Sequence, residues 1–144
     1  MGFQTDLLTG LAADLHSGSC GTWRASGVYT VAETAIIFGN IPQYPDRCIT
    51  LTAYGVSDDP SLSDSVIGVQ VRTRWGGLDP RLVNDLDDLI FARLHGRTNF
   101  TVNGVVVVQC HRNSAGSLGQ DQNGRWMNSS NYYFTVLRNS TYRT

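Results

Sequence analysis

The chain has 144 residues and a mass of 15.8 kDa, a size at which a single domain over residues 1–144 is expected. Hydrophobic residues make up 41% and charged residues 16%, which excludes disorder of the whole chain. The formal net charge of -1 excludes non-specific nucleic-acid binding as the main activity, because neutralising phosphates needs a clear excess of basic groups. All eleven basic residues are arginine, a bias that codon usage in a GC-rich genome or a preference for bidentate interface contacts would explain.

The cysteines and the N-terminal residues bear on where the chain folds. Cys20, Cys48 and Cys110 form no Cys-x-x-Cys pair and have no zinc-site spacing, which predicts reduced and mostly buried thiols. The first residues carry the acidic Asp6 and no basic region, so we expect neither a secretory signal nor, in the absence of a long apolar run, a membrane span. We therefore expect a cytoplasmic chain that uses no cofactor.

The first half of the chain predicts one helix and three strands. Leu7, Leu11 and Leu15 keep a helical period from about Thr5 until Gly18 ends it. A short apolar run at 35–38 and two segments of period two predict strands. The strands are expected at residues 35–38, 47–54 and 67–74, with a polar loop rich in Asp and Ser at 57–65.

The second half predicts a capped helix and a hairpin. Asp79 suits the N-cap and Pro80 the first helical position, because proline lacks the amide proton that would otherwise be unpaired there. Gly96 supplies the C-cap. The Asn103-Gly104 pair between two valines predicts a two-residue hairpin turn, because both central positions of such a turn need a positive φ.

The segments that follow the hairpin turn complete the predicted fold. Its second arm is expected over residues 105–112, where four consecutive valines predict a strand inside the sheet. A long polar loop follows at about 113–130, and a last strand at 132–138. This order of elements predicts an α+β fold in which two helices pack on one face of a mostly antiparallel or mixed sheet.

Catalytic and metal-binding patterns are weak throughout the sequence. Neighbouring residues of a strand point to opposite faces, so Cys110 and His111 do not form a nucleophile–base pair. The stretch that begins at Asp121 lacks the glycine and glutamate positions of a calcium loop. Asp85, Asp87 and Asp88 are interpreted as a solvated helix face. We therefore expect no enzyme and no metal site.

Interaction surfaces are the remaining candidates for function. Gln70, Arg72 and Arg74 alternate along one strand, so their side chains should form a row that is either a solvated face or an interface stripe. The loop at 113–130 is longer than most connections and contains Arg125 and Trp126, residue types that often anchor interfaces.

Several short motifs also occur in an order and at spacings that match a known family. They are Pro45-Asp46-Arg47 before the strand that ends at Tyr54, Val69-Gln70-Val71-Arg72-Thr73-Arg74, Asp79-Pro80, Leu94-His95-Gly96, and Arg112, Gly119, Asp121, Gly124, Arg125 and Asn131-Tyr132. With these motifs the chain resembles the phage minor capsid proteins that belong with the tail terminators of long-tailed phages, over about residues 5–138.

The resemblance implies a non-catalytic virion subunit that assembles in the host bacterial cytoplasm. It implies a hexameric ring on the head-proximal end of the tail tube, which stops tube polymerisation and offers a surface to the connector or stopper of the head. Its partners would be copies of itself, the tube protein and the connector, with no membrane and no sequence-specific nucleic acid, although a ring leaves a path for the genome. Candidate contacts are the loops at 57–65 and 113–130 and the side chains Gln70, Arg72, Arg74, Arg112, Arg125 and Trp126.

Two other classes stay open on the sequence alone. A head-completion or stopper protein of the phage neck would share the size, the ring symmetry and the lack of chemistry. A small cytoplasmic enzyme would need a pocket of convergent titratable groups, and the sequence does not display one.

Overall fold

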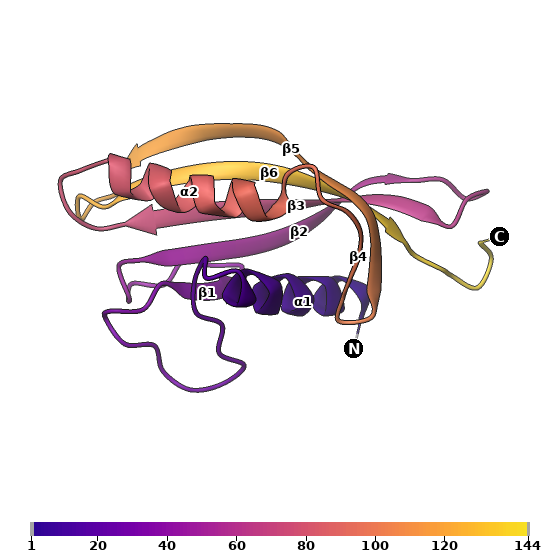
Figure 1. Cartoon of the computed structure of the whole chain (residues 1–144), viewed down its shortest axis with the longest axis horizontal. Coiled ribbons are helices and arrows are strands. Elements are labelled where there is room, and N and C mark those ends of the chain that lie inside the picture. Colours follow the sequence, from indigo (N-terminus) through magenta and orange to yellow (C-terminus); the bar gives the residue numbers. More distant parts are fainter. Residues whose placement is uncertain (1, 144) are drawn as a thin grey trace.

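The computed structural model describes residues 2–143 as two helices and one six-stranded sheet (Figure 1). The strand order is β1-β2-β3-β6-β5-β4, and every neighbouring pair is antiparallel except the parallel pair β1–β2. This confirms the predicted α+β class with a mixed sheet. The elements are α1 (Phe3–Ser17), β1 (Ala35–Phe38), β2 (Cys48–Asp58), β3 (Asp64–Trp75), α2 (Arg81–Leu94), β4 (Thr98–Val102), β5 (Val105–Gln120) and β6 (Trp126–Leu137).

The core lies between the two helices and one face of the sheet. Alternate residues of the central strands face it, as Val69 on β3 and Phe134 on β6 show by being fully buried. The helix α1 contributes its leucine stripe, and α2 contributes Leu86 and Ile90. Burying an aliphatic side chain stabilises a fold by about 1.5–3 kcal/mol, so this layer supplies the main driving force for folding.

An ion-pair cluster joins the two helices beside the core. The Asp14 carboxylate of α1 accepts hydrogen bonds from Arg93 of α2 at 2.9 and 3.1 Å and from Arg97 at 2.8 Å. Burial raises the pKa of Asp14, but the two guanidinium groups outweigh it and leave the pKa below its ordinary value. The carboxylate therefore stays ionised and holds the helices together at neutral pH.

The hairpin turn is confirmed, whereas both predicted caps of the second helix are off by one residue. The Asp79 carboxylate accepts the backbone N–H of Arg81 at 3.0 Å, but α2 begins at Arg81, so Pro80 occupies the N-cap position and Asp79 precedes it. His95 is the C-cap, and Gly96 follows it with φ +81°. Asn103 and Gly104 both have positive φ, 46° and 80°, and join β4 to β5 as the two-residue turn requires.

The predicted loop at 113–130 is wrong. The strand β5 continues to Gln120 and β6 already begins at Trp126, so only residues 121–125 form the connection. The sequence of this region shows little apolar alternation because the strands are held by backbone pairing with little side-chain burial. The loop expected at 57–65 is likewise shorter, since β2 extends to Asp58 and β3 starts at Asp64.

Two expectations about individual side chains have different outcomes. Cys20, Cys48 and Cys110 are free thiols in buried positions, as predicted. Asp87 does not belong to a solvated helix face, because it is only 8% exposed and faces the sheet from α2. Its neighbours Asp85 and Asp88 are exposed as expected.

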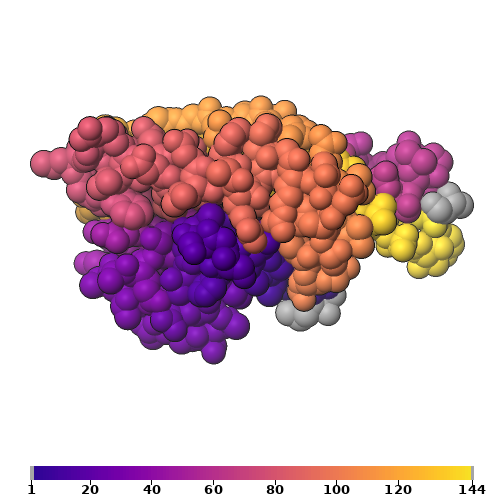
Figure 2. All heavy atoms as spheres, in the orientation of Figure 1, coloured from indigo at the N-terminus to yellow at the C-terminus, as the bar shows by residue number. Residues whose placement is uncertain are grey.

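One end of the sheet projects beyond the layer of helices. The β2–β3 hairpin extends past both helices and lies beside the C-terminal segment, and the two form a narrow arm in the space-filling view (Figures 1 and 2). We call this part, residues 55–66 together with 138–143, the arm.

Candidate functional site

The sheet face opposite the helices carries a network of polar side chains across four strands. The Tyr54 hydroxyl on β2 donates to Asn131 Oδ1 on β6 at 2.8 Å, and Asn131 Nδ2 donates to Ser114 Oγ on β5 at 3.1 Å. Gln70 on β3 donates to Ser129 Oγ at 3.4 Å. We call this surface the open face, and its hydrogen-bonding groups suit contact with another protein surface.

A glycine leaves room for the tyrosine ring of this network. The Tyr54 ring lies directly over Gly68 on the neighbouring strand, where an added Cβ would come within 2.3 Å of the ring. Partial burial raises the pKa of the Tyr54 phenol, so the hydroxyl stays protonated and acts as a donor at neutral pH.

The expected row of Gln70, Arg72 and Arg74 is not one exposed row. Arg74 is 1% exposed and donates to the carbonyl oxygens of Pro45 and Asp46, both at 2.8 Å. A period of two predicts which face a side chain occupies, but it does not reveal that a distant segment covers that face. Gln70 and Arg72 remain partly exposed, and the Arg72 side chain makes no hydrogen bond or ion pair with any residue between 2 and 143.

Arg125 fastens the β5–β6 turn to the same segment. It donates to Asp121 Oδ2 at 2.8 Å, to the Gln43 carbonyl at 2.6 Å and to Asp46 Oδ1 at 3.2 Å. Burial lowers the pKa of Arg125, but the carboxylates of Asp121 and Asp46 together outweigh it, and the net shift is upward. The i, i+4 spacing of Asp121 and Arg125 was the only sequence signal for this contact. At 6% exposure the side chain shapes the surface from within.

Arg112 lies beside a buried carboxylate between α2 and the sheet. Its guanidinium packs 4.4 Å from the centre of the Phe91 ring and lies 3.5 Å from Asp87 Oδ2. Ser130 donates to the other oxygen of Asp87 at 3.0 Å. Burial raises the pKa of Asp87 above its ordinary value and outweighs both partners. Arg112 itself stays partly exposed beside a hollow between α2 and β5.

Trp126 occupies the first position of β6. It is half-buried and lies opposite Trp75 of β3, whose ring carries the Arg47 guanidinium 4.4 Å from its centre. The indole N–H of Trp126 is buried and has no hydrogen-bond partner among the described residues.

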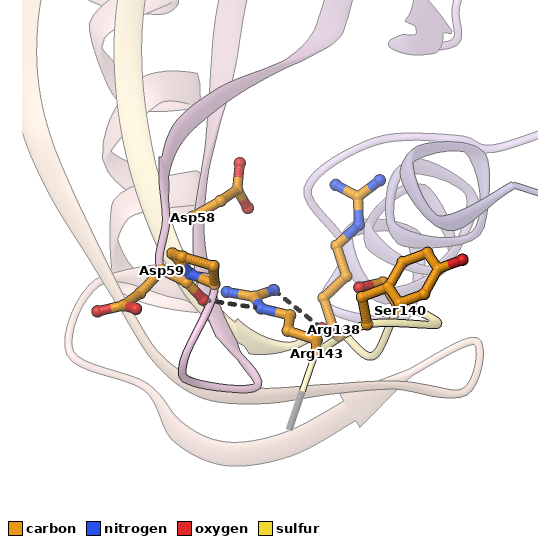
Figure 3. A pocket seen from close by; sticks show the side chains of 7 residues that line it. Asp58, Asp59, Arg138, Ser140 and Arg143 are labelled. Carbon is orange, nitrogen blue, oxygen red and sulfur yellow. Dashed lines mark hydrogen bonds between the residues drawn. The ribbon is translucent and has the colours of Figure 1, made fainter.

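The arm contains a polar hollow that sequence reasoning missed. Arg143 donates to the carbonyl oxygens of Asp59 at 3.0 Å and Arg138 at 2.9 Å (Figure 3). It also donates to the carbonyl of Asp64. Only the three-dimensional return of the C-terminal segment brings these residues together, and no sequence signal marks it. Tyr142 lies at the rim and is 94% exposed.

The described residues show limited means for chemistry. Between residues 2 and 143 no three His, Cys, Asp or Glu side chains lie close enough to share a metal ion. Burial raises the pKa of the Cys110 thiol to about 12, which leaves it a poor nucleophile. In the same part of the chain neither helix has the length and apolar character needed to cross a membrane.

A family model described as bacteriophage tail terminator protein matches residues 15–138, from the end of α1 to the residue after β6. The chain belongs to this family, and the resemblance seen in the sequence is confirmed. A search of the curated proteins finds no match.

Proposed function

We propose that this protein forms a ring on the head-proximal end of the phage tail tube. The ring ends tube growth and offers its other side to the connector or stopper of the head. The family match over residues 15–138 is the observation that carries the proposal, and it establishes a structural role in the phage tail. A hexameric ring, the head-side partner and the absence of catalysis are parts of the proposal.

The surface chemistry supports a steric and interfacial mechanism. A terminator must bind the last tube ring on one side and must not offer the next ring the same surface. The arm projects beyond the helices (Figure 2), whereas the open face lies on the sheet itself, so the two offer separate surfaces to different partners. Assembly would take place in the host bacterial cytoplasm, and the product would be part of the virion.

We propose six side chains as contacts or as supports of contacts. Four of them are partly exposed and can contact a partner directly: Gln70 and Arg72 on the open face, and Arg112 and Trp126 elsewhere on the surface. The buried Arg74 and Arg125 act through the segment they hold, residues 43–46.

Disruption of the gene in the phage that carries it tests the function. Negative-stain electron microscopy of the particles should show headless tails of variable and excessive length, because nothing ends tube growth. Expression of the intact chain from a plasmid should restore tails of uniform length. Tails of normal length beside unattached heads would indicate a head-completion or stopper protein instead, and intact infectious particles would refute the structural role.

A further inference from the structure

Two strands of the sheet run beyond the strand that covers their outer edge. The strand β1 pairs with β2 only along Cys48–Leu51, and β4 pairs with β5 only as far as Gln109. Within residues 2–143 no strand pairs with the outer edge of β2 over Thr52–Asp58 or of β5 over Asn113–Gln120. Because β2 and β5 are each second from an end of the sheet, the two open stretches face opposite sides of the subunit.

The backbone groups of β2 that face outward follow from one hydrogen bond. The Gly39 N–H donates to the Leu51 carbonyl at 3.1 Å across the outer edge. Backbone groups of a strand alternate between its two edges, so those of Ala53 and Gly55 also face outward. Neither residue has a backbone hydrogen-bond partner on that side in the described chain.

The corresponding groups of β5 follow in the same way. The Arg112 N–H donates outward to His95 Nδ1 at 3.0 Å. A bulge between Arg112 and Ser114 interrupts the alternation along β5, so it is followed along β6 instead. Ala115 and Ser117 pair with alternate residues of β6, as Arg112 does, so their backbone groups also lie on the outer edge. Each open stretch therefore presents two successive sets of outward N–H and C=O groups.

Both stretches lack the residues that usually protect a strand edge. Neither contains lysine, arginine or proline, and the single acidic residue is Asp58 at the end of β2. Bulges limit the regular part of each stretch to Thr52–Gly55 and Ser114–Ser117, which have the same length. An exposed edge of this kind is a template for another strand.

A glycine inside the β5 stretch has no explanation within the subunit. Gly116 has no positive φ, and an added Cβ there would meet nothing within 4 Å. Gly68, by contrast, is needed under the ring of Tyr54. A glycine in a strand interior often marks the close approach of another backbone.

We propose that Thr52–Gly55 of one subunit pairs with Ser114–Ser117 of a second copy as antiparallel strands. Three antiparallel pairings separate β2 from β5, so the two strands run in opposite directions. A neighbouring copy in the same orientation therefore presents β5 antiparallel to β2. The two edges differ, so each added subunit leaves one edge of each kind free until the assembly closes. The inference rests on the proposed ring and assigns its subunit contact.

Cysteine cross-linking tests the pairing directly. Gly55 and Ala115 lie opposite each other when all the outward backbone groups of the two stretches pair, and both are exposed. An added Cβ at Gly55 would meet nothing within 4 Å, and the three native cysteines are buried, so Gly55→Cys and Ala115→Cys introduce the reactive thiols. A short bismaleimide reaches both directly opposite and diagonal positions of paired strands. In purified tails, and in the purified protein at high concentration, the double variant should give a ladder of covalent oligomers that ends at the ring. Each single variant should give monomer only, since position 55 would face position 115 and not itself.

The possible results of these experiments distinguish the proposed strand pairing from the proposed ring. A multimeric mass by native mass spectrometry without a ladder in the double variant would overturn the edge pairing and leave the ring standing. Cross-linking of a single variant would overturn the pairing in favour of a symmetric contact. Tails that lack the chain, together with a purified protein that stays monomeric, would overturn the proposed function and the pairing together.

A proline substitution gives a second test at the same edge. Ala115→Pro removes an N–H that faces outward and leaves the β5–β6 hydrogen bonds intact, whereas the matched control Ala115→Val keeps the N–H. We expect the proline variant to retain its thermal unfolding midpoint and lose the oligomer, and the valine variant to retain both. A folded proline variant that assembles like the parent protein would refute the proposal, and if the variant does not fold the cross-linking result decides.

Discussion

Removal of the Arg125 side chain should destabilise the fold, because three acceptors depend on it. In Arg125→Ala the Asp121 carboxylate and the Gln43 carbonyl lose charge-assisted hydrogen bonds, worth about 1.5–3 kcal/mol each. The Asp46 contact adds little, because that side chain is 54% exposed and water screens it. Water reaching the vacated site offsets part of the loss, and we expect a net loss of about 2–4 kcal/mol. For a chain of this size the melting temperature should fall by about 5–15 °C.

Differential scanning calorimetry on the parent protein and two variants measures this effect. Arg81→Ala is the matched control, since Arg81 also pairs with an aspartate, Asp79, but its side chain is 83% exposed. The control should melt with the parent protein, because surface ion pairs contribute little. A melting temperature of Arg125→Ala within about 2 °C of the parent would refute the reasoning that this contact fastens the β5–β6 turn.

Further predictions concern pH, packing and assembly. Asp14→Asn should lower the melting temperature at pH 7 and lose this effect as the pH falls through and below 3.8, because the folded state lowers the pKa of Asp14. Asp87→Asn should show the opposite dependence on pH, because burial raises the pKa of Asp87. The parent protein should lose stability as the pH rises through that raised pKa, and the variant should not, in a pH series of melting curves. In Gly10→Ala the new Cβ would lie 2.7 Å from Val102 Cβ, and overpacking of about 1–3 kcal/mol should outweigh the helix gain of about 1 kcal/mol in urea unfolding. Arg72→Glu should melt like the parent but give tails of uneven length in electron micrographs; uniform tails would exclude Arg72 as a contact.

Short-range signals predicted the parts of the fold that depend on few residues. Asp79 before Pro80 located the start of α2, and the Asn103-Gly104 pair located the β4–β5 turn, because each sequence satisfies a local backbone requirement. The leucine period of α1 was equally direct, since one face of that helix supplies core residues. These features hold whatever the rest of the chain does.

The parts of the fold that the sequence did not predict depend on contacts between distant segments. Ser114–Ser117 has small and polar side chains and no apolar alternation, yet it is a strand because β6 lies beside it. The side chains of Arg74 and Arg125 seemed free to reach a partner, but the segment at residues 43–46 accepts their hydrogen bonds. An alternating pattern predicts the face that a side chain occupies, and only the folded chain shows what covers that face.

The central place of β6 has a consequence for biosynthesis. This strand lies between β3 and β5, and it is the last strand to leave the ribosome. Until then β3 and β5 have no common neighbour, so the middle of the sheet cannot close. The contacts that β6 makes join segments far apart in the sequence, a kind of pairing that forms slowly. If the chain assembles as proposed, it can do so only after β6 has been made, because both edges of the proposed contact belong to a sheet that β6 completes.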